Sequence, residues 1–340
     1  MDWSFTEEQE QVAALTRHIL ERELNEERRR SAGPFDKGLY RTLTDAGVLD
    51  ASLGLIELCR VLIEIGRAVA PVPAAASAIA RRVAPVEASL PTLALSEELN
   101  PDLETPMTRA ARKGDVFVLS GAKTTVPAGP FADLFVVSAS LDDGTPGLFA
   151  VPRRSSGVDV QEQVVTSTDR EAVLELNDVE VPAAHRLGGA EALKSAIDHI
   201  TVALCAVQLG VCERALELTA EYSKQRVQFD RPIATFQAVG QRLADAFIDV
   251  EAIRLTLWQA AWRLSEGLPS DTEIATAKFW ASDAGHRVAH TAVHVHGGVG
   301  IDLDHALHRY FVAAKRTEFA LGGATEHLVV IGKALADEPA

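Results

Sequence analysis

The chain has 340 residues, of which 47% are hydrophobic and 24% are charged, and this is the composition of a globular protein with room for two or three domains. Its net charge of −15 argues against broad binding to nucleic acid or anionic membranes, although a few local cations can still hold an anionic ligand. The polar N-terminus is unlike a signal peptide, and no apolar run reaches the ~18–20 residues of a membrane span, so we expect a cytoplasmic protein.

Residues 1–90 are predicted to form an N-terminal helical domain. Thr6 and Gln9 have the spacing of a capping box ahead of an apolar stripe that ends at Leu20. Three more helices are predicted at Asp36–Asp45, at Leu53–Ala70 and in an Ala-rich stretch that ends near Val83.

Residues 91–188 are predicted to form a middle β-domain, because short apolar runs alternate with Gly and Asp turn signals. Strands are expected at Thr92–Ser96, Val116–Ser120, Asp133–Ala139, Gly147–Val151 and Ala172–Leu176. The segment therefore predicts a small β-barrel or sandwich.

Residues 189–340 are predicted to be helical again. Long amphipathic segments cover about 191–225, 237–266, 271–296 and 306–336. Because the links between them are short, the pattern predicts an antiparallel four-helix bundle.

The most informative segment runs from Arg226 to Val239, with the sequence RVQFDRPIATFQAV. An Arg beside an exposed Phe, followed by a Gln at a helix start, can hold a diphosphate and a flat ring. The segment alone is also compatible with a solvent-exposed helix–turn–helix that binds no ligand.

This segment resembles the R-x-Q-F-G-x-P-I-x-x-F-Q-A-V motif of acyl-CoA dehydrogenases, with Asp230 in place of the usual Gly. Leu119–Lys123 followed by Ala132–Val137 resembles the family's middle β-domain. His296–Gly300 followed by Leu307–Phe311 resembles its flavin-contact turn and last helix. The resemblance implies an α+β multi-domain fold with an N-terminal helical domain, a middle β-barrel and a C-terminal four-helix bundle.

In that family four subunits associate through the bundle, and each binds FAD with help from a neighbour. Arg226, Phe229 and Gln237 are then expected to contact the diphosphate and adenosine of a neighbour's FAD. The resemblance implies three more cofactor contacts: Gly297 and Gly298, where the backbone can approach closely, and His294, where the family usually has Gln.

Two other patterns in the C-terminal region lack the rest of their motifs. The Gly297–Gly300 run follows a helix rather than a strand, so a Rossmann loop is not expected. His286, His290 and His294 share a helix face, but no Cys or acidic ligand is placed with them, so we expect packing and hydrogen bonds rather than a metal.

The positions of the family's catalytic base are apolar in this chain. The family reaction needs a carboxylate that removes the α-proton of an acyl-CoA while the flavin accepts a hydride. The resemblance places this Glu on the last helix, at Leu321 or, one residue on, Gly322. The alternative position, 26 residues before Arg226, is Ile200. We therefore predict that the chain supplies no catalytic base.

Two nearby acids, Asp198 and Glu326, are the alternative candidates for the catalytic base. A self-sufficient enzyme would use Asp198.

Two other departures from the family pattern concern the flavin and acyl site of this chain itself. The Gly-rich loop is shortened to Gly47–Gly54, and the family's T-E-P-x-A-G-S-like flavin loop is reduced to Leu95–Asn100. By contrast, the residues expected to bind a neighbour's FAD are present.

This asymmetry resembles the shortened subunit of the α2β2 heterotetrameric acyl-CoA dehydrogenases of actinobacterial steroid side-chain breakdown. The expected partner is a catalytic acyl-CoA dehydrogenase subunit, and the expected cofactor is FAD. Two alternatives stay open. One is a homotetrameric enzyme that uses Asp198, and the other is a flavin-free scaffold without activity.

Overall fold

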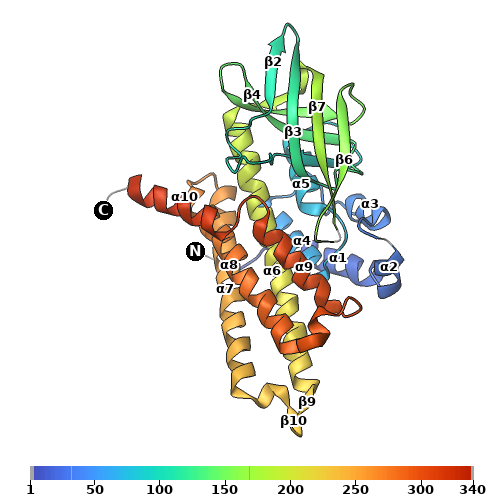
Figure 1. Cartoon of the computed structure of the whole chain (residues 1–340), viewed down its shortest axis with the longest axis vertical. Coiled ribbons are helices and arrows are strands. Elements are labelled where there is room, and N and C mark those ends of the chain that lie inside the picture. The colour runs from blue at the N-terminus through green and yellow to red at the C-terminus, as the bar shows by residue number, and fades with distance from the viewer. Residues whose placement is uncertain (1–3, 32, 168, 338–340) are drawn as a thin grey trace. The chain divides into compact units, whose positions relative to one another are not determined.

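The computed structural model describes residues 4–31, 33–167 and 169–337 (Figure 1). Its contacts separate into two compact units. The helical unit contains Met1–Arg22, Gly54–Ala70 and Thr201–Ala340, and the sheet unit contains Glu23–Leu53 and Pro71–Ile200. Each unit combines segments from different sequence regions, so the division into domains at 90 and 188 remains an expectation.

The sheet unit carries three short helices, α2 (Glu26–Ser31), α3 (Lys37–Asp45) and α5 (Ala74–Val83). Helix α3 begins where the Asp36 carboxylate accepts a hydrogen bond from the Leu39 amide, which satisfies a free N–H of the first turn. The same carboxylate is paired with Arg28 at 2.6 Å. Burial by itself would raise the pKa of Asp36, but the hydrogen bonds from Arg28 and Leu39 lower it.

The centre of the sheet unit is an eight-stranded sheet in the order β6-β7-β3-β2-β4-β5-β8, with β1 paired in parallel with β4. The strands are β1 (Pro91–Ala94), β2 (Arg109–Lys113), β3 (Val116–Pro127), β4 (Leu134–Leu141), β5 (Pro146–Pro152), β6 (Val158–Val164), β7 (Arg170–Pro182) and β8 (Arg186–Gly188). Phe117, Phe135 and Phe149 fill its core, where the rings of Phe117 and Phe149 meet edge to face.

The helical unit contains α1 (Glu7–Glu23), α4 (Leu55–Ala68), α7 (Gln237–Ser265), α8 (Asp271–His296), α9 (Ala306–Phe319), α10 (Ala324–Asp337) and most of α6 (Ala190–Gln225). Helices α4 and α6 touch backbone to backbone. A Cβ on Gly66 would lie 2.2 Å from the Val207 oxygen, and a Cβ on Gly210 would lie 2.0 Å from the Ile63 oxygen. Glycine at both positions is therefore what lets α4 lie directly on α6.

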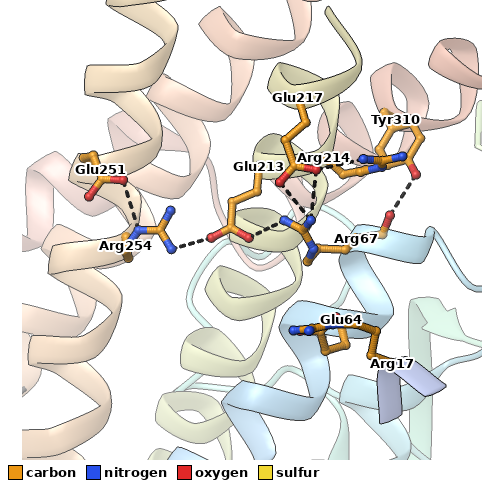
Figure 2. A network of polar contacts seen from close by, with 9 residues as sticks. All are labelled: Arg17, Glu64, Arg67, Glu213, Arg214, Glu217, Glu251, Arg254 and Tyr310. Atoms are coloured by element: carbon orange, nitrogen blue, oxygen red, sulfur yellow. Dashed lines mark hydrogen bonds and ion pairs between the residues drawn. The ribbon is translucent and has the colours of Figure 1, made fainter. Parts of the chain in front are cut away.

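Ion pairs join the same helices (Figure 2). Arg67 of α4 binds Glu213 and Glu217 of α6, each at 2.8 Å, and Glu213 also pairs with Arg254 of α7 at 2.6 Å. The Tyr310 hydroxyl of α9 donates to the Arg67 carbonyl at 2.7 Å. The last turn of α4 is thus bound directly to α6 and α9, and Glu213 links it to α7.

The last helix of the sequence prediction is two helices. Helix α9 ends at Phe319 and α10 begins at Ala324, so the expectation of one helix over 306–336 was wrong. The chain turns at Leu321 and Gly322, whose φ values of 57° and 94° are left-handed and cannot continue a helix.

Two stretches, Ala190–Gln225 and Ala306–Asp337, are long and apolar enough to cross a membrane by length and composition alone. The first is mostly buried inside the protein, as the core helix of a bundle is. The second is interrupted by the turn between α9 and α10.

Candidate cofactor site

The segment that follows α6 forms a tight hairpin at the end of the bundle where α6 and α7 meet (Figure 1). Strand β9 (Val227–Gln228) pairs with β10 (Arg231–Pro232), and only Phe229 and Asp230 connect them. Their φ values are 53° and 62°, so both loop residues are left-handed, as a type I′ turn requires. Asp tolerates this conformation, whereas Phe229 is held in a strained one.

The side chains of this hairpin face solvent. Phe229 is 87% exposed, and the Arg231 guanidinium lies 4.3 Å from the centre of the Phe236 ring. The Arg226 backbone is fixed through Tyr222 and Ile233, but within the described residues its exposed guanidinium makes no hydrogen bond or ion pair. Exposed Gln237 is the first residue of α7. A strained exposed ring beside an available cation suits a ligand that arrives from outside the chain.

The end of α8 lies against the end of α6. The His296 ring stacks on Tyr222 with ring centres 4.2 Å apart, and Tyr222 is one helical turn before Arg226. After His296 the chain enters the 3₁₀ turn η3 (Gly297–Ile301). The structure therefore brings Gly297 to the same end of the bundle as the hairpin.

The backbone of η3 requires glycine at positions 297 and 300 but not at position 298. Gly297 has a φ of 64°, and a Cβ on Gly300 would meet the Val293 carbonyl at 3.0 Å. Gly298 has neither constraint, because no atom of the described chain lies within 4 Å of its Cβ position. The fold of the chain itself does not require glycine at 298, which leaves room there for an external group.

His286 and His290 of α8 lie beside α9, where the His290 ring meets the Phe311 ring edge to face. His294 is exposed in the last turn of α8. His286 lies 3.2 Å from Glu318 and 4.3 Å, centre to centre, from the His290 ring, and Lys315 pairs with Glu318 at 2.5 Å. Burial, followed by the charges of His286 and Lys315, lowers the pKa of His290.

The positions expected for the catalytic base hold no acid. Ile200 is 4% exposed within α6, and Leu321 is half-buried in the turn after α9. Of the fallback acids, Asp198 is paired with Lys194 at 2.8 Å, and Glu326 accepts a hydrogen bond from the Gly323 amide at 3.0 Å as α10 begins. Both carboxylates are engaged in helix contacts.

The sheet unit contains a buried ion pair that was not predicted from the sequence. Lys123 of β3 is completely buried, and its Nζ donates to the Glu97 carboxylate at 2.6 Å and to the Ser138 hydroxyl at 2.9 Å. Burial lowers the pKa of Lys123 to about 8. Burial alone would raise the pKa of Glu97, but the Lys123 ammonium and the Thr108 hydroxyl lower it to about 2.

Glu97 organises the segment from Leu95 to Thr108, which begins with the reduced loop Leu95–Asn100. Its two oxygens accept hydrogen bonds from the amides of Met107 and Thr108, and from the Asn100 side chain. A Cβ on Gly121 would lie 2.8 Å from the Thr108 hydroxyl, so glycine lets Thr108 reach Glu97. A lysine within the strand sequence LSGAK was the available signal that a buried acid must face it.

Comparisons with known proteins decide the family. The model of the acyl-CoA dehydrogenase C-terminal domain matches residues 188–336. Acyl-CoA dehydrogenase FadE27 of Mycobacterium tuberculosis is 43% identical over the whole of both chains. The chain belongs to the acyl-CoA dehydrogenase family. FAD is the cofactor of this family.

Solved structures show the same fold. The ChsE4–ChsE5 complex from Mycobacterium tuberculosis contains a chain that is 42% identical, with a TM-score of 0.93 and complete coverage of both chains. The Tcur3481–Tcur3483 steroid ACAD G363A variant contains one that is 36% identical, with a TM-score of 0.91 and coverage of 97% and 98%. The acyl-CoA dehydrogenase fold predicted from the motifs is confirmed.

The exposed groups at the hairpin fit the nucleotide half of FAD. A guanidinium available for forked hydrogen bonds suits a diphosphate, an exposed Phe ring suits the adenosine, and the free Cβ space at Gly298 admits a group close to the backbone. When bound, FAD supplies the hydride acceptor of the family reaction.

Proposed function

We propose that this chain is the non-catalytic subunit of a heterotetrameric, FAD-dependent acyl-CoA dehydrogenase. In this assembly it holds the adenosine and diphosphate of a partner subunit's FAD, and the partner supplies the catalytic carboxylate. The observation that carries the proposal is a contrast within one chain. The hairpin cation and ring are exposed and available, whereas Ile200 and Leu321 fill both base positions.

The proposed FAD contacts are those expected from the sequence: Arg226, Phe229, Gln237, His294, Gly297 and Gly298. They lie on the hairpin, at the start of α7, at the end of α8 and in η3, and all belong to the helical unit. Exposure supports the view that they serve a neighbour, because a site for the chain's own cofactor would be at least partly enclosed.

Abstraction of the α-proton requires a base within hydrogen-bond reach, and loss of one typically lowers the rate by ~10²–10⁴-fold. Asp198 does not favour the alternative of a self-sufficient enzyme, because its carboxylate is paired with Lys194. We therefore assign this chain no catalytic residue. The proton goes to the partner's carboxylate, and this chain contributes by holding and orienting the cofactor.

The proposed substrate class is the CoA ester of a steroid side chain. Support comes from the Tcur3481–Tcur3483 protein, whose name describes a steroid ACAD. The heteromeric form is likewise supported by that pair and by the ChsE4–ChsE5 complex. The cytoplasm is the proposed setting.

The proposal is tested by co-expressing the chain with its genomic neighbour. We expect native mass spectrometry and flavin absorbance to give an α2β2 complex with one FAD per pair of unlike chains. Steroid-CoA turnover should require both chains. A homotetramer of this chain that is saturated with FAD and reduced by acyl-CoA would overturn the proposal. A stable, colourless homo-oligomer that ignores the partner would favour the scaffold instead.

Arg226→Ala tests the assigned role directly. A charge-assisted phosphate bond contributes about 1.5–3 kcal/mol, so FAD affinity of the complex should fall about 10–100-fold while the fold is kept. The matched control is Arg41→Ala, which removes an exposed guanidinium of α3 paired only loosely with Asp45 at 3.4 Å. Equal FAD occupancy of the Arg226 and Arg41 variants at limiting cofactor would contradict the assignment.

A further inference from the structure

A lysine in the bundle is buried against backbone oxygens at the end of α9. Lys278 of α8 is completely buried, and its Nζ donates to the carbonyls of Gly322 at 2.8 Å, and of Thr317 and Glu318 at 3.2 Å each. It also donates to the Ser282 hydroxyl at 2.8 Å. These carbonyls include the free oxygens of the last turn of α9, where the helix dipole favours a cation.

The turn after α9 is held from both sides. His327 of α10 lies with its Nε2 3.2 Å from the Leu321 carbonyl, and burial and the nearby Lys278 charge lower the pKa of His327 to about 4. The neutral ring therefore donates its N–H to that oxygen. Glu326 caps the Gly323 amide. Lys278 and His327 thus bind successive carbonyls of a turn in the strained left-handed conformation, and this turn sets the direction in which α10 starts.

No residue of helix α10 is fully buried, although the helix packs against α8. Leu328, Val329 and Val330 are 49%, 51% and 44% exposed, and Leu335 is 69% exposed. Three consecutive residues span about 200° of a helix perimeter. The apolar surface therefore extends around more than one face, and covering it requires a surface that encloses the helix on more than one side.

A membrane does not fit this helix. Its 14 residues are about 21 Å long, shorter than the ~30 Å hydrocarbon layer, and Lys333 is its only lysine or arginine, whereas helices that lie on membranes carry basic polar faces. A protein groove fits better. Two close structural relatives are chains from pairs of unlike proteins, so we take the partner subunit as the occupant.

We propose that Lys278 is a positioning residue, which fixes the Leu321–Gly322 turn so that α10 is preformed as an apolar arm for the partner acyl-CoA dehydrogenase subunit. This inference rests on the proposed function and adds to it the element that recognises the partner. It also assigns a role to the Leu321–Gly322 turn, which in this chain carries no catalytic base.

The experiment is a double-mutant cycle on the complex with the partner subunit that the co-expression test yields. Lys278→Met removes the ammonium, and Leu328→Gln with Val329→Gln makes the arm polar without touching a buried residue. Each should weaken association of the full-length chains at least about tenfold by titration. Because both act through the same arm, the combined variant should be no weaker than the weaker parent.

A control separates positioning from general stability. Lys123→Met combined with Glu97→Gln removes the other completely buried lysine together with its partner, and should lower Tm without changing the association constant. If Lys278→Met does not fold, Ser282→Ala, which removes one Lys278 contact, should show the same effect at smaller size.

The outcomes are distinct. Wild-type association that survives both the lysine and the arm variants would overturn this inference alone, as would additive effects in the cycle. Wild-type binding to vesicles of anionic phospholipid that the arm variant abolishes would also overturn it. Failure of the wild-type chain to associate with the subunit at all would instead overturn the proposed function.

Discussion

The Glu97–Lys123 pair allows a quantitative prediction for Glu97→Gln. The carboxylate is 3% exposed and the ammonium is completely buried, so the substitution leaves a buried cation without its counter-charge. Breaking one side of a buried pair costs about 3–5 kcal/mol. The lowered pKa of Glu97 has the same pairing as its cause and gives a figure of similar size. A shift of the Glu97 pKa from 4.5 to about 2 corresponds to about 3 kcal/mol of stability at neutral pH.

The pH dependence has a defined sign. Because the folded-state pKa of Glu97 is lowered, its contribution is fully present above pH 4.5 and is lost as the pH falls from about 4.5 to about 2. We expect urea unfolding followed by circular dichroism to show this loss in the wild type. The Glu97→Gln variant should lack that part of the acid dependence and be less stable at pH 7 by about 3 kcal/mol.

Two controls make the result specific. Glu98→Gln changes the next residue of the same loop, which is exposed, and should shift stability by less than about 0.5 kcal/mol. Adding Lys123→Met to Glu97→Gln removes the stranded charge and should recover part of the loss. Amide exchange should accelerate at whichever of Met107 and Thr108 faces the new amide NH2, because Gln keeps only one of the two acceptor oxygens. A loss below about 1 kcal/mol, or no recovery in the double variant, would refute the reasoning.

Three further variants test the rest of the structure. Gly210→Ala should destabilise the chain by about 1–3 kcal/mol or more in thermal unfolding, because its Cβ would lie 2.0 Å from the Ile63 carbonyl of α4. Gly298→Ala meets open space, so Tm should stay unchanged while the FAD content of the complex falls. Asp198→Ala should leave steady-state turnover of the complex unchanged, and a large loss would restore it as a base candidate.

The helices of the bundle were predictable from sequence because periodicity and breakers agree there. The 271–296 segment has the bounds of α8, and α7 ends one residue before the prediction. The strand prediction was less complete. The strand expected at Val116–Ser120 runs to Pro127, because irregularities after Leu119 and Lys123 let β3 stay paired with β7 past Gly121. Strand β2 was missed because RAARK is mostly polar.

The exposed half of the candidate site was also visible in the sequence, since a linear motif carries it. The buried charges were not. Glu97 and Lys123 are 26 residues apart in the chain, and only the pairing of the sheet brings them together. Lys278 binds carbonyls 39 to 44 residues away, and a backbone oxygen leaves no trace in a residue pattern. The break inside the predicted 306–336 helix could have been read from Gly322 and Gly323.

The role of the turn at Leu321 follows only from the sequence motif and the structure together. The motif alone says that an acid is missing, which suggests a degraded site. The structure shows that the turn is nevertheless held closely, by Lys278 at the Gly322 carbonyl and by His327 at the Leu321 carbonyl. Burying a cation against these oxygens costs free energy, so we infer that the conformation of the turn has a role. Under the proposed function no proton is removed there. The consequence of the turn should therefore be measured on the element whose position depends on it, the exposed helix α10.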